Sequence, residues 1–409
     1  MDRVIFHIDV NNAFLSWEAV HRLEQGVAGP DLRTIACAVG GDASKRHGVI
    51  LAKSMEAKKY KVQTGEPITD ALRKCPHLTI ISPTHDIYPK YSRAFIEILH
   101  KYTDKVEQVS IDEAFMDMTG TEKLFGKPLE IAERIKSEIY DNLGFTVNVG
   151  ISSCKILAKM ASDFEKPNKI HTLFPEEIPT KMWPLPVGDL FSVGKASAAK
   201  LQSIGILTIG DLAATDPEYL KSHLKKHGES IWRFANGMDD SPVEPVPPEN
   251  KGYGNSTTLP ADVTESTEAK KILLSLAEKV GRRLREDDAR IEVVSVGIRF
   301  FDLSNISHQT VLESPTNITM EIHRAACKLF DEMWDGTPIR LLGIQTGRVS
   351  RGESNRQMSL FDTTDYEKME KLDRAIDSIR QKFGNDAICR AAFMESQGKV
   401  PPGGNSDEE

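Results

Sequence analysis

Residues 107–118 read EQVSIDEAFMDM and place the adjacent acids Asp112 and Glu113 between two apolar segments. Successive side chains of a flat strand point to opposite faces, so two neighbouring acids converge only where the backbone bends. We therefore interpret this stretch as a strand, a tight bend over residues 110–113 and a second strand. A bent acidic pair suits Mg²⁺, which prefers oxygen ligands and usually binds through one or two carboxylates and substrate phosphates. The alternative is a pair of solvated turn residues.

A third acid, far away in the sequence, favours the metal site. Asp9 follows the apolar run Val4–Ile8, which is long enough for a buried strand. Asn11 and Asn12 can cap a helix that follows. An acid between a strand and a helix lies at a sheet edge, where α/β folds bind ligands. Three carboxylates from two strands can hold two Mg²⁺ ions, the arrangement that stabilises the attacking and leaving oxygens of an in-line displacement.

Three blocks of sequence resemble a known family. HIDVNNAFLSWEAV (7–20), SIDEAFMDM (110–118) and VGISSCKILAKMASDFEKPN (149–168) are similar to the motifs of Y-family translesion DNA polymerases of the DNA polymerase IV type. The order and the separations of the blocks are also similar, and the resemblance extends over residues 1–350. It implies an error-prone, poorly processive, template-directed polymerase that transfers deoxynucleotides to a primer 3′-hydroxyl.

The resemblance implies an α+β multidomain fold, the right-hand polymerase. Its expected parts are a palm at 1–12 and 78–171, small fingers at 13–77, a helix-hairpin-helix thumb at 172–240, a linker at 241–250, a little finger at 251–350 and a tail at 351–409. We expect the palm to be a mostly antiparallel sheet with helices on one side, and to include a strand at 78–81. The little finger shows the split β-α-β-β-α-β pattern.

The metal ligands are carried over from the resemblance. Asp9 and Asp112 would bridge both ions, Glu113 would help to hold the ion that activates the 3′-hydroxyl, and the backbone carbonyl of Val10 would complete a shell. The expected cofactor is Mg²⁺, two ions per active site, with Mn²⁺ as an alternative.

The resemblance also implies contacts with a deoxynucleoside triphosphate. Phe14 would be a steric gate beneath the sugar, where a rigid ring leaves no room for a 2′-hydroxyl. Lys58 and Lys166 would bind the phosphates. Without the resemblance, Phe14 reads as a core residue and both lysines read as solvated surface. The family usually has threonine, tyrosine and arginine where this chain has Ala52, Met55 and Lys58, and lysine lacks arginine's bidentate fork.

Primer-template DNA is the expected macromolecular partner. Gly194 and Lys195 lie in a predicted helix-hairpin-helix, which can offer backbone N–H groups to a DNA phosphate. Seven arginines of the little finger can line a DNA-facing sheet, with a solvated surface as the alternative: Arg282, Arg283, Arg285, Arg290, Arg299, Arg340 and Arg348. The net charge of −8 is unusual for a nucleic-acid-binding protein. We therefore expect weak, salt-sensitive binding through local basic patches.

The tail contains a short motif, QMSLF at 357–361. It resembles the peptide by which bacterial polymerases bind the sliding clamp, with Leu360 and Phe361 filling an apolar pocket and Gln357 as a polar anchor. A chance match is the alternative. Clamp tethering would compensate for weak DNA affinity through effective concentration. Apolar residues at helical spacing then predict an amphipathic helix: Met369, Leu372, Ile376 and Ile379.

Composition restricts the remaining possibilities. The five cysteines are scattered without C-x-x-C spacing, which favours a reducing cytoplasm and argues against zinc. No apolar run approaches membrane-spanning length. We expect a monomer without a membrane partner. Two rival functions stay open: another two-metal palm phosphotransferase, such as a phosphodiesterase or nucleotidyl cyclase, and a non-catalytic DNA- or clamp-binding scaffold.

Overall fold

The computed structural model describes residues 3–41, 48–352 and 365–396. The chain divides into two compact units, with the division between Pro247 and Pro248. Each unit has its own hydrophobic core and is described by itself. In the described ranges, no helix is both long and apolar enough to cross a membrane.

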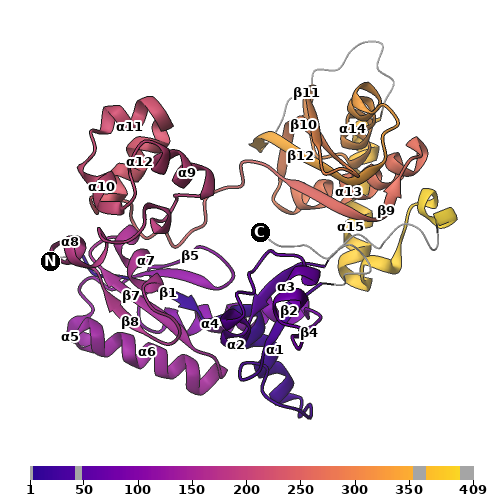
Figure 1. Ribbon diagram of the computed structural model, residues 1–409. Coiled ribbons are helices and arrows are strands. Elements are labelled where there is room, and N and C mark those ends of the chain that lie inside the picture. The colour runs from indigo at the N-terminus through magenta and orange to yellow at the C-terminus, as the bar shows by residue number, and fades with distance from the viewer. Residues whose placement is uncertain (1–2, 42–47, 353–364, 397–409) are drawn as a thin grey trace. The chain divides into compact units, whose positions relative to one another are not determined.

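A five-stranded sheet carries the acidic residues of the first unit (Figure 1). Its strands, in spatial order, are β5 (Val106–Gln108), β6 (Glu113–Asp117), β1 (Ile5–Val10), β7 (Val147–Ser152) and β8 (Ile170–Thr172). All neighbours are antiparallel except β7 and β8. The predicted bend is confirmed: β5 and β6 pair, and the N–H groups of Val109 and Ser110 both donate to the carbonyl of Glu113. The acids therefore lie at a strand end.

Helices cover both faces of this sheet. Phe6 and Ile8 of β1 pack on one face with residues of three helices, α1 (Ala13–Glu24), α4 (Tyr88–His100) and α6 (Pro128–Leu143). On the other face, Ile5 packs with Ala158 of α7 (Lys155–Asp163). The expectation of helices on one side is therefore wrong. The periodicity of a helix indicates an apolar stripe but not which face of a sheet it will cover.

A separate three-stranded sheet lies in the region expected to be the fingers. Its order is β3 (Ile50–Lys53), β2 (Cys37–Gly40) and β4 (Thr79–Ile81), accompanied by α2 (Met55–Lys59) and α3 (Ile68–Lys74). Because β4 pairs in parallel with β2, the assignment of residues 78–81 to the palm sheet is wrong. A short apolar run fits either sheet, and only the pairing decides. Helix α1 serves both cores, since Trp17 packs with the large sheet and Leu15 with the small one.

The region expected to be the thumb is helical. Five short helices surround a core that includes Leu201, Ile209 and Leu220, and α7 shares this core through Met160. They are α8 (Ile178–Lys181), α9 (Lys195–Ser203), α10 (Ile209–Ala214), α11 (Pro217–Leu224) and α12 (Lys226–Ala235). Another short α-helix of the first unit is α5 (Glu122–Phe125).

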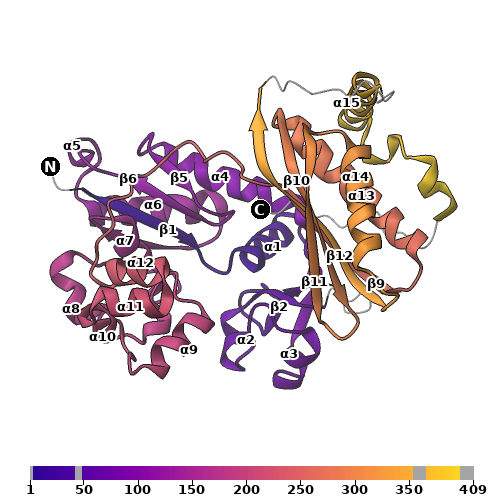
Figure 2. The ribbon, with the colours of Figure 1, turned by 90° about the horizontal axis from the view of Figure 1, so that it is seen from above.

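The second unit has the predicted β-α-β-β-α-β order. Its elements are β9 (Gly254–Val263), α13 (Ser266–Glu286), β10 (Ala289–Phe300), β11 (Asn305–Thr316), α14 (Thr319–Met333) and β12 (Ile339–Arg351). The strands form an antiparallel sheet in the order β11-β10-β12-β9. Figure 2 shows α13 and α14 on the same side of this sheet, and the core between them includes Val280, Val294 and Phe330.

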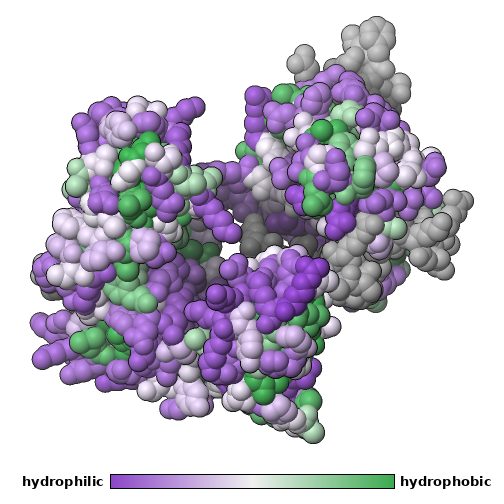
Figure 3. Space-filling view, in the orientation of Figure 1, coloured by the Kyte–Doolittle hydropathy of each residue, from purple (hydrophilic) through white to green (hydrophobic). Residues whose placement is uncertain are grey.

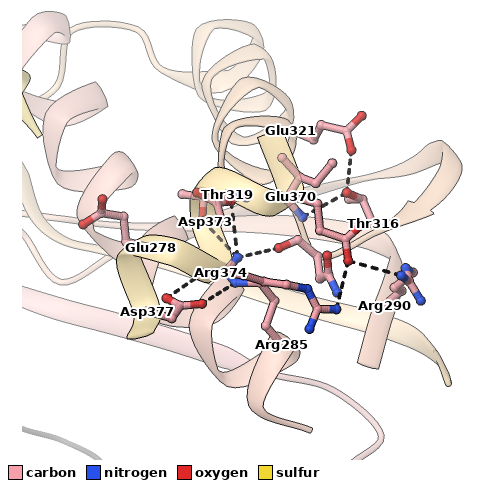
Figure 4. A network of polar contacts seen from close by, with 12 residues as sticks. Glu278, Arg285, Arg290, Thr316, Thr319, Glu321, Glu370, Asp373, Arg374 and Asp377 are labelled. Carbon is pink, nitrogen blue, oxygen red and sulfur yellow. Dashed lines mark hydrogen bonds and ion pairs between the residues drawn. The ribbon is translucent and has the colours of Figure 1, made fainter. Parts of the chain in front are cut away.

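A further helix, α15 (Tyr366–Phe383), completes the second unit. The predicted helix is present, but its buried residue is polar: Asp373 is buried, whereas Leu372 is 54% exposed. Asp373 and Asp377 instead pair with Arg285 of α13, at 3.3 and 2.6 Å (Figure 4). Arg390 joins the network by pairing with both Asp373 and Glu278.

The structure corrects the expectation for three of the seven arginines of the little finger, while the other four lie on β10 and β12. Arg282, Arg283 and Arg285 lie on α13 and not on the sheet. Arg285 is buried, and its Nη1 also donates to the carbonyl oxygen of Asn317. The run of arginines looked like a DNA-binding surface because carboxylates more than 80 residues away are invisible in a local pattern.

Candidate active site

Asp9 and Glu113 face each other in the large sheet. They are partners in the antiparallel register of β1 and β6, so their side chains project from the same face. Asp9 is 7% exposed, and Glu113 is partly buried. The two acids come from the strand exit and the bend that sequence analysis singled out. The structure therefore brings together two of the three expected metal ligands.

Asp112 lies in the bend beside them. Its backbone carbonyl accepts a hydrogen bond from the N–H of Val10 at 3.0 Å, and its carboxylate accepts one from Ser110 Oγ at 2.6 Å. Across the described residues, no three His, Cys, Asp or Glu side chains stand close enough together to hold a metal ion. The three predicted carboxylate ligands therefore do not come close enough together to form a complete metal-binding cluster.

The donor chemistry still fits a hard divalent cation. Asp9, Asp112, Glu113 and the Val10 carbonyl offer only oxygen, which is what Mg²⁺ prefers. In addition, lysine ammonium groups lie within ion-pair distance of the carboxylates of Asp9 and Glu113, which shows that this place attracts a cation.

Two lysines provide these ammonium groups. Lys159 Nζ lies 2.8 Å from Glu113 Oε1 and 3.8 Å from Asp9 Oδ2, and Lys166 Nζ lies 2.8 Å from Asp9 Oδ2. Asp163 pairs with both lysines, at 3.7 and 2.8 Å. Sequence analysis identified Lys166 but missed Lys159 and Asp163. Both stand in the third family-like block, which was the available signal.

The two opposed carboxylates differ in acidity. Burial raises the pKa of Asp9 to about 6, although the charge of Lys166 opposes the rise. Burial would also raise the pKa of Glu113, but its polar contacts, among them the ion pair with Lys159, bring that pKa down to about 2. Glu113 is therefore the permanent anion of the pair, whereas Asp9 changes its charge near neutral pH.

His7 lies beneath Glu113 and is fully buried. Ser162 Oγ donates to the carbonyl of Lys159 and lies 2.8 Å from His7 Nδ1, so this nitrogen carries the ring proton. His7 Nε2 faces Glu113 Oε2 at 3.5 Å and lacks a proper hydrogen bond. Burial lowers the pKa of His7, so the ring is neutral at pH 7. We therefore attribute the stabilisation of the Glu113 carboxylate chiefly to Lys159.

Close packing holds α7 and its lysine against the sheet. A Cβ atom at Gly150 of β7 would lie 2.0 Å from the carbonyl oxygen of Ala158, so only glycine allows this approach. The N–H of Ile156, in the first turn of α7, donates to Asp239 Oδ2 at 3.0 Å. Lys159 is thus fixed by a strand and by a residue 80 positions away.

Asn11 fixes the segment that carries Lys166. Its Oδ1 accepts from the N–H of Asn168 at 2.7 Å, and its Nδ2 donates to Asn148 Oδ1. The expected helix cap is wrong: Asn12 is the N-cap residue of α1, but neither asparagine caps it through its side chain. The polar side chain instead joins β1 to the chain after α7.

Phe14 lies in the first turn of α1 and is partly exposed. Its ring centroid is 4.6 Å from that of Tyr88 and 5.9 Å from that of Trp17. The Tyr88 hydroxyl donates to Glu18 Oε1 at 2.8 Å, which fixes the neighbouring ring. A partly exposed ring that packs against two other aromatic rings is compatible with a steric gate for the sugar and also with a residue of the hydrophobic core.

Helix α2 ends with two exposed lysines, of which Lys59 is in an ion pair. Lys58 is exposed, whereas Lys59 pairs with Glu56. Burial, followed by the charge of Lys58, lowers the pKa of Lys53, so these two cations lie in the same electrostatic environment. Ala52 is buried in the core of the small sheet. An anion would relieve the repulsion between Lys53 and Lys58.

Gly194 and Lys195 begin α9. Gly194 is its N-cap residue, without a side-chain cap, and both residues are exposed. The first N–H groups of a helix lack partners within it and attract anions.

Figure 3 shows that the face in view is mostly hydrophilic, with apolar residues in separate small patches. The predicted clamp-binding residues, Gln357, Leu360 and Phe361, lie outside the described residues.

Comparison with known proteins identifies related sequences. The impB/mucB/samB family model matches residues 8–163, its C-terminal domain matches 250–360, and the helix-hairpin-helix motif of the same family matches 175–206. The DNA polymerase IV of Clostridium acetobutylicum is 45% identical over 399 residues, which are 98% of this chain and 100% of that protein. DNA polymerase IV 2 of Bacillus subtilis is 39% identical, over 98% of this chain and 96% of that protein.

A solved structure has a similar fold. A Y-family DNA polymerase chimera superimposes with a TM-score of 0.72 and 22% sequence identity. The match covers 85% of this chain and all of that one. This likeness supports the right-hand fold.

Proposed function

This chain belongs to the impB/mucB/samB family of Y-family DNA polymerases, and we infer from its relatives and its active site that it is a DNA-directed DNA polymerase for translesion synthesis. The observation that carries the assignment in this molecule is the register pair of Asp9 and Glu113. Two opposed carboxylates at a strand end, flanked by lysines, match the needs of phosphoryl transfer better than those of a scaffold. A scaffold has no use for two acids held 104 residues apart in sequence.

The proposed metal ligands are Asp9, Asp112, Glu113 and the carbonyl of Val10. Two Mg²⁺ ions held there, with Mn²⁺ as an alternative, would stabilise the attacking and leaving oxygens of the displacement. The ammonium groups at Asp9 and Glu113 support this proposal because they mark the place where positive charge is favourable. Asp112 is proposed as the third carboxylate ligand, and its Oδ1 accepts a hydrogen bond from Ser110 Oγ in the metal-free protein.

Other side chains position the nucleotide. Lys166 and Lys58 bind the triphosphate, and Phe14 excludes the 2′-hydroxyl of a ribonucleotide. The exposure of Lys58 and its repulsion of Lys53 support a role in holding phosphate. Because Lys58 binds as a point charge and lacks an arginine fork, we expect it to hold the phosphates less rigidly. The small sheet is short-stranded, which supports a loosely enclosed base pair and low fidelity.

Primer-template DNA is bound without sequence readout. The N–H groups at Gly194 and Lys195 contact a backbone phosphate, which fixes position but carries no sequence information. We propose that Gln357, Leu360 and Phe361 bind the sliding clamp and thereby offset the weak DNA affinity of an acidic protein. The enzyme would work as a monomer in the cytoplasm.

Primer extension tests the proposal. The wild-type chain should add templated deoxynucleotides to a primed template in Mg²⁺, and Asp112→Asn should lose about a hundredfold to a thousandfold in rate, the scale seen when transition-state charge stabilisation is removed. Asp117→Asn is the matched control: it changes an acid at the far end of β6, the strand that follows Asp112, where it pairs with Lys105, and it should extend like wild type.

The two rivals predict different results. A wild type that binds DNA or clamp but never extends a primer would support the scaffold. A wild type that hydrolyses or cyclises nucleotides without a template would support another palm phosphotransferase.

A further inference from the structure

Lys159 is the meeting point of three carboxylates. Its Nζ lies 2.8 Å from Glu113 Oε1, 3.7 Å from Asp163 Oδ2 and 3.8 Å from Asp9 Oδ2. Its side chain is only 11% exposed. Burying an ammonium group is unfavourable unless the group is paired, so Lys159 can be buried only because these carboxylates compensate its charge.

The position of Lys159 is built by the fold. Gly150 lets α7 approach the sheet closely enough for the lysine to reach across β1 to Glu113. Lys155, one turn earlier on the same helix, pairs with Glu107 at 2.6 Å. The two lysines of α7 therefore pair with different acids: Lys155 pairs with Glu107, and Lys159 contacts Asp9 and Glu113.

We propose that Lys159 is a positioning residue that acts as the internal counter-cation of Asp9 and Glu113. It holds the two carboxylates together before a metal ion arrives, and it competes with that ion for them. The inference rests on the proposed function of Asp9 and Glu113 as metal ligands. It goes beyond that function because it assigns to a lysine the control of metal affinity in the nucleotide-free enzyme.

The electrostatics sets the direction of the effect. Without Lys159, Glu113 loses its nearest cation and the opposed carboxylates repel each other. A divalent cation then gains more by binding, because only the ammonium of Lys166, and no longer that of Lys159, has to be displaced. A unit charge about 4 Å from a divalent ion changes its binding constant by about tenfold or more, even at high dielectric.

Binding of Mn²⁺ alone to the full chain measures this directly. Free Mn²⁺ is followed by electron paramagnetic resonance, without DNA or nucleotide. Lys159→Met should bind Mn²⁺ about tenfold more tightly than wild type, and Lys159→Arg, which keeps the charge, should remain near wild type. Lys155→Met, the matched control on the same helix, should leave the affinity unchanged. Equal or weaker binding by Lys159→Met would overturn the proposal.

Two further measurements keep the result interpretable. Asp9→Asn should weaken Mn²⁺ binding; if it does not, the measured ion is elsewhere and the proposal fails. If circular dichroism shows that Lys159→Met is unfolded, Lys159→Gln compared with Lys159→Arg gives the same test. Primer extension by wild type is scored separately. A wild type that fails to extend a primer refutes the proposed function, whereas the ratio of the Mn²⁺ affinities of Lys159→Met and wild type decides the role of Lys159.

Discussion

Lys166 Nζ lies 2.8 Å from Asp9 Oδ2, although 157 positions separate the two residues in the sequence. The lysine expected to bind a triphosphate is thus held by a carboxylate expected to bind metal. Each partner of this ion pair has to leave the other before it can take its proposed role. In the nucleotide-free enzyme the charged groups of the site are therefore paired with one another.

The first prediction concerns the dependence of stability on pH. The pKa of Asp9 is raised to about 6, above its ordinary 3.8, mainly by burial. Between these values the folded protein holds a proton that the unfolded chain has lost, so stability falls as the pH rises through this window. Asp9→Asn should therefore raise the free energy of unfolding at pH 7.5 by about 1–3 kcal/mol.

Urea unfolding with a chelator present measures this effect. At pH 4 the aspartic acid is already protonated in the fold, so the gain from Asp9→Asn should be small there. Equal stabilities of wild type and variant at pH 7.5 would contradict the raised pKa.

The second prediction concerns Gly150. Gly150→Ala places a Cβ atom 2.0 Å from the carbonyl oxygen of Ala158, so α7 must move away from the sheet. We expect a loss of about 3 kcal/mol or more in unfolding free energy and a loss of primer extension, because α7 carries Lys159. Gly297→Ala in β10 is the control, since nothing lies within 4 Å of its added Cβ, and it should change the stability little.

The third prediction separates the two roles of Phe14. If the ring is a sugar gate, Phe14→Ala should raise ribonucleotide incorporation relative to deoxynucleotide incorporation by about tenfold or more. Phe125→Ala removes a ring that packs against the same core and contacts Tyr102, and it should leave the ratio unchanged. A ratio that stays constant in Phe14→Ala would assign the ring to the core alone.

The fourth prediction concerns the network between α13 and α15. Arg285→Ala leaves Asp373, whose side chain is 5% exposed, without its partner on α13. We expect this variant to lose about 3–5 kcal/mol of stability. Arg374→Ala is the control, because this α15 residue makes exposed ion pairs with Glu370 and Asp288, and it should lose less than about 1 kcal/mol. Similar losses in the two variants would show that burial does not govern the network.

The fifth prediction concerns the clamp. Leu360→Ala and Phe361→Ala should abolish the increase in product length that a sliding clamp brings, while short products made without the clamp stay unchanged. Gel analysis of extension products, with and without a loaded clamp, separates the two outcomes. Clamp stimulation that survives both changes would place the contact elsewhere in the chain.

The sequence by itself determined the features that depend on neighbouring residues. The bend at Asp112, the strand that carries Asp9 and the β-α-β-β-α-β order of the second unit all follow from local periodicity and turn chemistry, and the structure confirms them. The blocks that resemble the family are also continuous stretches of sequence, so Lys166 and Phe14 could be identified from them.

Only the tertiary structure decided which distant segments meet. It paired β4 with β2, covered the second face of the large sheet with α7, and turned Arg285 from an expected surface residue into a buried partner of Asp373. It also brought Lys159 to Glu113, a contact between residues on a helix and a strand. The physical reason is that pairing and charge compensation depend on the positions of groups in space, whereas periodicity records only the preference of each segment for a helix, a strand or a turn.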